Sequence, residues 1–113
     1  MAYTTIDKPD EYSNTVLYTG NGSTQSITGV NFQPDWVWIK SRSTTYSHIL
    51  HDVIRGVRKQ LKSNSSDAES TDTNGLTAFN SDGFSLGTGS AVNNNSTTFV
   101  SWNWKAGGSP SSN

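Results

Sequence analysis

The sequence contains no cysteine, which excludes disulfide bridges, thiolate catalysis and cysteine-based zinc sites. Charge is also scarce: charged residues make up 15% of the chain, and eight basic against nine acidic residues give a net charge of −1. Neutralising a phosphate backbone needs clustered lysine and arginine, so this balance argues against nucleic-acid binding. No apolar run approaches the length of a membrane span, and residues 1–5 lack the features of a signal peptide. We therefore expect a protein that folds in a bacterial cytoplasm and does not insert into a membrane.

The residues that helices favour are few. Lys, Glu, Ala and Leu are scarce, whereas Ser, Thr, Asn and Gly, which suit turns and the polar faces of sheets, are abundant. Hydrophobic residues make up only 31% of the chain, but four tryptophans, four tyrosines and four phenylalanines can each bury a large area. The 113 residues therefore predict one domain of sheets and turns around a modest aromatic core.

Short β-prone segments alternate with turn residues along the chain. Strands are expected in or near residues 15–19, 23–29, 35–40, 48–53, 55–61, 75–79, 84–87 and 98–105. Asp82-Gly83 predicts a tight hairpin turn with positive φ values, and residues 62–74 predict a long surface loop. With about seven or eight strands and no convincing helix, the pattern favours an all-β, antiparallel β-sandwich or jelly roll. We assign it to residues 14–106, between an N-terminal arm (1–13) and a Gly/Ser linker or tail (107–113).

The tryptophans occur as two alternating pairs, Trp36/Trp38 and Trp102/Trp104. Val37 and Ile39 make the other face of the first segment apolar as well, which predicts a central strand covered on both sides. We expect the rings to meet in the interior, where the predicted core aromatics are Trp36, Trp38, Phe84, Phe99, Trp102 and Trp104. The alternative is that exposed indoles stack against sugars, and Trp104, at the end of its strand, is then the first candidate for exposure.

One cluster of two histidines and an aspartate is a candidate for metal binding or acid–base chemistry. His48, His51 and Asp52 offer ligands for zinc or a general base. The odd spacing of the two histidines places them on opposite faces of a strand, however, and ligands must converge. We favour a polar strand edge in which Asp52 pairs with Arg55.

A second group of carboxylates lies in the predicted loop. Asp67, Glu69 and Asp72 offer oxygen ligands for calcium, but their spacing does not match a calcium-binding loop, and a solvated loop is favoured. No serine lies in a nucleophile-elbow sequence, and no glycine-rich loop matches a phosphate cradle. We expect no metal, no cofactor and no enzymatic activity.

Two regions are candidates for contacts with partners. Arg55, Arg58, Lys59 and Lys62 form the one basic cluster, which suits either an acidic neighbour or a charged edge that blocks stray strand pairing. The arm has no core-forming pattern, so Tyr3 and Ile6 are expected to contact a partner rather than the sandwich.

Several sequence runs together resemble a known type of domain. They are LYTGNGSTQSI (17–27), FQPDWVWIKSR (32–42), HDVIRG (51–56), FNSDGFSLG (79–87) and FVSWNWKAGG (99–108). In this order they resemble a domain common in phages of marine bacteria, found near the start of tail fibres and other virion surface proteins. Its strand pattern is similar to that of concanavalin-like or SPRY-like sandwiches, and it brings no catalytic or metal motif.

The resemblance implies a non-enzymatic bacteriophage structural protein on the virion surface, in a tail fibre, another appendage or a capsid decoration. We expect it to dock on other virion proteins and on copies of itself, as a homo-oligomer, through the arm and the sheet edges. The alternative is a carbohydrate-binding module for host adsorption, in which loops Ser41–Ser47, Lys62–Asn74 and Thr88–Thr97 bind a host surface glycan. A glycan depolymerase would need two carboxylates across a cleft, and no sequence feature singles out such a pair.

Overall fold

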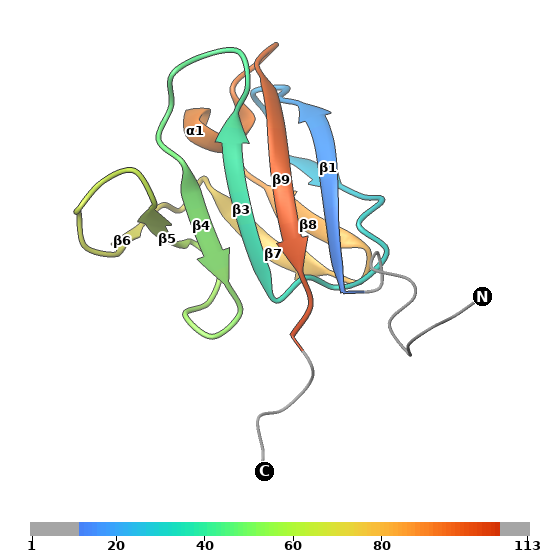
Figure 1. The fold of residues 1–113 in the computed structure, drawn as a ribbon. Helices are drawn as coiled ribbons and strands as arrows, with labels where there is room; N and C mark the ends of the chain where they lie inside the picture. The colour runs from blue at the N-terminus through green and yellow to red at the C-terminus, as the bar shows by residue number, and fades with distance from the viewer. Residues whose placement is uncertain (1–11, 107–113) are drawn as a thin grey trace.

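The computed structural model describes residues 12–106 as two stacked antiparallel sheets (Figure 1). The larger sheet has the order β1 (Ser13–Thr19), β9 (Thr98–Trp104), β3 (Trp36–Ser41), β4 (Ile49–Asp52), β5 (Lys59–Lys62) and β6 (Ser70–Thr71). The smaller sheet, behind it in Figure 1, has the order β2 (Gln25–Ile27), β8 (Gly83–Leu86) and β7 (Leu76–Asn80). A single helical turn, α1 (Ser90–Asn93), precedes β9.

The predicted all-β antiparallel fold is confirmed, with nine strands where seven or eight were expected. The additional strand, β6, is a two-residue edge within the segment predicted as a loop. The turn α1 lies where no helix was expected. The arm residues Tyr3 and Ile6 and the predicted tail 107–113 lie outside the described residues.

The core fills the space between the two sheets. Phe99 on β9 and Phe84 on β8 are fully buried, which confirms both as core aromatics. Tyr18 on β1 stacks on Phe99 at a centroid distance of 5.3 Å and meets the Phe84 ring edge-on at 6.3 Å. Its hydroxyl donates a hydrogen bond to the Val92 carbonyl (2.7 Å), and burial raises the pKa of this phenol well above its ordinary value. These rings join both sheets and α1 into one interior.

The expectation that all four tryptophans lie in this interior is wrong. Val37 and Ile39 on β3 are fully buried, so Trp36 and Trp38 point to the opposite, outer face. On β9 the inner positions are Phe99, Ser101 and Asn103, which leaves Trp102 and Trp104 on the outer face too. The Asn103 side-chain amide donates to the Asn14 carbonyl (3.1 Å) and to the Ser101 hydroxyl (3.1 Å), so its donor group is satisfied inside. Next to Phe99, the inner positions of β9 carry the small side chains Ser101 and Asn103, and both indoles of this strand lie on the other face.

The predicted hairpin between β7 and β8 is confirmed, but its turn residues are Ser81 and Asp82. Asp82 does not adopt the positive φ that was expected. Its carboxylate instead accepts hydrogen bonds from the backbone N–H groups of Gly29 (3.0 Å) and Asn31 (2.7 Å), which lower its pKa. Through these two hydrogen bonds, the turn holds the loop that follows β2 in place.

We predict that Gly83→Ala destabilises the domain strongly. A Cβ at this position would lie 1.8 Å from the Ile27 carbonyl oxygen, and that oxygen belongs to the neighbouring strand β2 and cannot move freely. Overpacking of this kind costs roughly 3 kcal/mol in the free energy of unfolding, measurable by urea denaturation. Gly75→Ala is the matched control, because its Cβ would meet a side-chain atom of Asp72 at 3.3 Å. Equal stability of the two variants would contradict the prediction.

Candidate functional site

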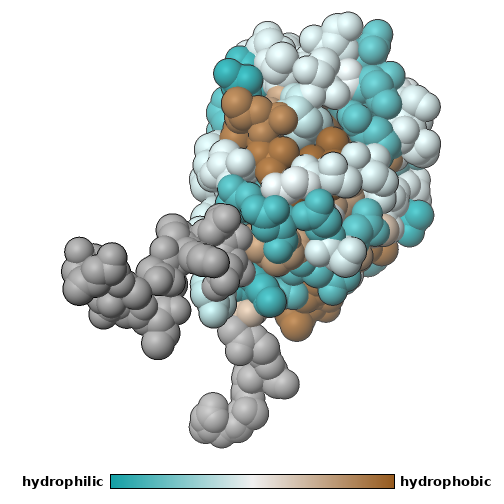
Figure 2. Space-filling model, turned by 90° about the vertical axis from the view of Figure 1, so that its right-hand side faces the viewer, coloured by the Kyte–Doolittle hydropathy of each residue, from teal (hydrophilic) through white to brown (hydrophobic). Residues whose placement is uncertain are grey.

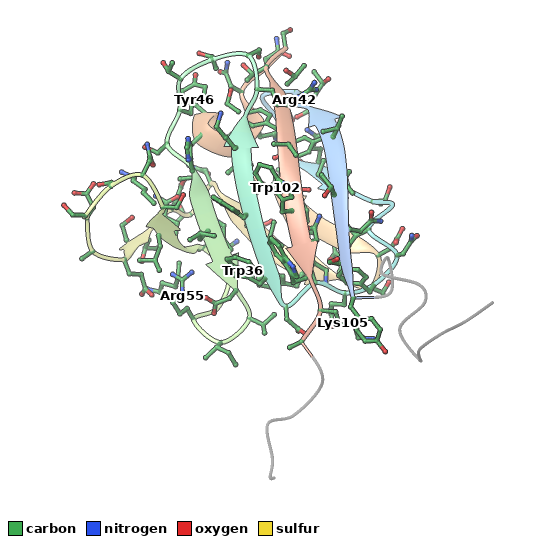
Figure 3. All side chains as sticks on the ribbon, viewed as in Figure 1. Trp36, Arg42, Tyr46, Arg55, Trp102 and Lys105 are labelled. Carbon is green, nitrogen blue, oxygen red and sulfur yellow. The ribbon has the colours of Figure 1, made fainter. Side chains whose placement is uncertain are left out.

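Four tryptophans form a cluster on the outer face of the six-stranded sheet, which we call the tryptophan face. Figure 3 labels one from each strand, Trp36 on β3 and Trp102 on β9. In the register of the two central strands, Trp36 lies opposite Trp104 and Trp38 lies opposite Trp102. The ring centroids are 4.3 Å apart in the first pair and 5.0 Å in the second, and Trp36 and Trp38 are 6.4 Å apart along β3. The four rings therefore touch one another across the middle of the sheet.

The tryptophan face has no layer of described residues packed over it. The three-stranded sheet covers the opposite side of β3 and β9, and all four indoles remain partly exposed. An antiparallel sheet in water normally presents polar side chains on its free face. A contiguous aromatic surface in that position is typical of a binding site.

The indole N–H groups differ in how they are used. Trp38 donates from Nε1 to the Ser63 hydroxyl at 3.1 Å, which fixes its ring toward β5. Within residues 12–106, the other three indoles donate no hydrogen bond to the protein. The face therefore offers three N–H donors together with its apolar ring surfaces.

Polar side chains flank three of the four rings, and the half-buried Leu50 on β4 lies opposite the fourth, Trp38. On β1, Ser13 lies opposite Trp104, and the exposed Thr15 lies opposite Trp102. On β4, Asp52 lies opposite Trp36. Hydroxyl and carboxylate groups thus lie directly beside an aromatic surface. Sequence reasoning considered Asp52 only with the two histidines and with Arg55, and it singled out neither Ser13 nor Thr15.

Arg55, which was predicted to contact a partner, is held within the chain. Its guanidinium donates to the Asp52 carboxylate (2.6 Å), to Glu69 (3.3 Å) and to the carbonyl oxygens of Leu50 (3.2 Å) and Lys59 (3.5 Å). These contacts confirm the predicted Asp52–Arg55 pair and join β4 to β5 and to the loop beyond it. Burial raises the pKa of the Asp52 carboxyl, but hydrogen bonds and charge from Arg55 outweigh this and lower it overall.

The rest of the basic cluster also has intramolecular partners. Arg58 donates to the Thr73 carbonyl (3.3 Å), Lys59 to the Thr71 hydroxyl (2.8 Å), and Lys62 lies 3.8 Å from the Asp67 carboxylate. These three side chains therefore contact residues around the β5–β6 edge of the sheet. Whether the cluster blocks stray strand pairing or meets an acidic neighbour stays a prediction.

His51 is the most deeply buried titratable side chain on β4, not the polar edge residue that was expected. It is fully buried on the inner face, and neither ring nitrogen has a hydrogen-bond partner. Burial, together with the nearby positive charge of Arg55, lowers the pKa of the imidazole to about 4. His48 precedes the strand and is only half-buried, so the two histidines do not converge.

The loop carboxylates are not brought together either. Asp67 faces Lys62 and Glu69 faces Arg55, while Asp72 accepts the N–H of Asn74 (2.9 Å) in a turn. Within residues 12–106, no group of three or more His, Cys, Asp or Glu side chains is placed to hold a metal ion. No helix in the same part of the chain has the length and apolarity needed to cross a membrane.

The three loops proposed for glycan binding lie in different places. Residues 41–47 and 88–97 lie at one end of the sandwich, where the Ser43 hydroxyl accepts the N–H of Thr98, the first residue of β9 (3.0 Å). Residues 62–74 project from the side of the sheet, around β5 and β6 (Figure 1). They do not form one site, and the tryptophan face is the stronger candidate surface.

We predict that His51 makes the domain sensitive to acid. Its pKa of about 4 in the folded state lies below the ordinary 6.5, so the unfolded state binds more protons between these values. Stability is full above pH 6.5 and falls as the pH is lowered toward 4, by about 3 kcal/mol in the free energy of unfolding. Urea denaturation across this range should show that His51→Leu loses this slope and that His48→Leu retains it. The same slope in all three proteins would show that the buried imidazole plays no part.

We also predict that Arg55→Met lowers stability by about 2 kcal/mol, because it leaves Asp52 and Glu69 without their charged partner. Arg58→Met is the control, since this exposed arginine donates one long hydrogen bond to a carbonyl. Thermal unfolding of both variants measures the two losses of stability. A larger loss for Arg55→Met shows that Arg55 is structural, whereas equal losses would show that it is free to contact a partner.

Comparison with known proteins identifies one family. No curated protein and no solved structure matches the chain. A family model described as a domain of unknown function, DUF7483, matches residues 8–113, which is nearly the whole sequence and includes both central strands with their tryptophans. The chain belongs to the DUF7483 family.

Proposed function

We propose that this chain is a non-enzymatic recognition module exposed on the surface of a bacteriophage particle. The observation that carries the proposal is the tryptophan face, an aromatic surface on the free side of a sheet whose other side already holds the core. Surfaces of this kind are used for binding. The phage setting rests on the sequence runs that resemble virion surface proteins.

The arrangement of the acid–base groups supports a non-enzymatic role. His51 is sealed from solvent, and Asp52 and Glu69 are both held by the same guanidinium. A general acid or base must reach a substrate proton, and these side chains have other partners or no access.

A second candidate function is structural docking, in which a neighbouring virion subunit covers the tryptophan face. One observation favours it: the Ile54 side chain is 91% exposed on a turn held by Asp52 and Arg55, next to the Trp36 end of the sheet. Exposed aliphatic residues on fixed turns are suited to the core of a protein interface. In this case the face would be hidden in the particle rather than presented to the outside.

If the chain acts in recognition, we predict that its incorporation into the phage particle does not depend on the tryptophan face. Antibodies against the folded chain should label intact purified particles in immunogold electron microscopy. A chain with Trp102→Ser should be incorporated at the normal level, because this ring points away from the core. A chain that lacks residues 1–11 should stay folded but fail to be incorporated, because the arm is proposed to anchor the module.

The outcomes separate the two candidates. Labelling of intact particles with normal incorporation of the tryptophan variant supports recognition. Loss of incorporation in that variant, with unchanged circular dichroism, supports structural docking. Antigen found only in lysates and never on particles would contradict both.

A further inference from the structure

We propose that the tryptophan face binds neutral glycans by stacking pyranose rings on its indoles. This inference rests on the proposed recognition function and names the ligand of the same surface. Its site is the middle of the six-stranded sheet, and not the loops at its ends.

The geometry places four indoles in one cluster, with the cross-strand rings tilted by 37° and 43° to each other. Two cross-strand pairs follow each other along β3 and β9, with Trp36 and Trp38 separated by 6.4 Å. Each indole keeps part of its surface in water although it contacts its neighbours. The C–H groups on one side of a pyranose are apolar, and they pack favourably against aromatic rings.

The polar groups around the cluster match what sugar hydroxyls need. Trp36, Trp102 and Trp104 have indole N–H groups that donate to no acceptor within residues 12–106, and each can donate to a hydroxyl oxygen. Thr15 supplies a hydroxyl beside Trp102, and Ser13 supplies one beside Trp104. A ligand with an apolar side and a rim of hydroxyls satisfies both kinds of group.

Charge favours a neutral ligand. The four rings carry no charge, and the Asp52 carboxylate opposite Trp36 is paired with Arg55 at 2.6 Å. The ammonium group of Lys40, further along β3, donates to the Ser41 carbonyl (3.0 Å). Of the described residues 12–106, Lys40 is the cation that follows the tryptophans on β3, so an anionic glycan would meet little positive charge there.

The position of the exposed aliphatic groups argues for a glycan over a second protein. A protein interface has an apolar core and a polar rim. Here the most exposed aliphatic residues, Leu17 (58% exposed) and Ile54 (91% exposed), lie outside the aromatic cluster. Leu50, the aliphatic residue opposite Trp38, is half-buried, and hydroxyl groups adjoin Trp102 and Trp104. Figure 2 views the neighbouring side of the molecule, where β1 forms the edge of the sheet, and shows brown apolar patches separated by hydrophilic residues there.

The experiment uses the fluorescence of the full chain. All four tryptophans of the protein lie on this face, so its intrinsic tryptophan emission reports on the site alone. The probes are cellohexaose, xylohexaose and mannohexaose, with hexagalacturonate as the anionic comparison. We expect at least one neutral hexaose to change the emission in a saturable way and hexagalacturonate to bind at least about tenfold more weakly.

Variants test whether the rings are responsible. Trp104→Ala should weaken binding by about tenfold or more, whereas Trp104→Phe should retain most of it because a ring remains. Ile54→Ser is the matched control, since it removes an exposed apolar side chain outside the cluster and should bind as the unaltered chain does. Circular dichroism establishes that each variant is folded, as expected for outward-facing positions.

Three results would overturn the inference: no saturable change with any neutral hexaose at millimolar concentration, binding of hexagalacturonate alone, or equal losses in Trp104→Ala and Ile54→Ser. Light scattering provides a further readout. If no neutral hexaose binds and the chain forms a dimer that Trp104→Ala abolishes, the face belongs to an interface with a second copy of the chain. Labelling and incorporation of particles are measured without sugar. A negative result in the glycan titration therefore overturns the glycan inference alone, and the particle experiment tests the recognition role separately.

Discussion

The strict alternation of side chains along β3 and β9 is the constraint on which the rest of the structure depends. Each sheet of a two-layer sandwich has one inner face, and a side chain one residue away must point outward. Once Val37, Ile39 and Phe99 occupy the interior, the tryptophans between and beside them have no place there. The antiparallel register then sets both pairs side by side, so one choice of face creates the whole aromatic surface.

The interior shows why this choice is stable. The space between the sheets is already filled by three rings, Phe84, Phe99 and Tyr18. The inner face of β9 also carries Ser101 and Asn103. Exchanging the faces of β9 would bury two indoles and expose Phe99. It would also remove the Asn103 amide from the Asn14 carbonyl that it now reaches across to β1. Packing and hydrogen bonding therefore favour the same orientation.

Much of the fold was predictable from the sequence, because β-prone runs and turn residues are local signals. The strands around Val37, Phe84 and Phe99 and the Asp52–Arg55 pair were all expected, and they are present. The orientation of the tryptophans was not predicted, because alternation gives the two faces of a strand but not which of them is inner. A signal was available: in a two-layer sandwich, a strand that is apolar on both faces must expose one of them. The burial of His51 depends on contacts distant in sequence, and no local pattern reveals it.

The pairing of β1 with β9 has a mechanical consequence. Ser13 lies opposite Trp104, so the two ends of the described fold leave the sheet at the same end of the same strand pair. A force that separates these ends loads the hydrogen bonds between the two strands one after another, beginning at Ser13, rather than all at once. The module therefore opens by peeling at low force, and a tether attached through both ends would yield gradually instead of resisting as a rigid clamp.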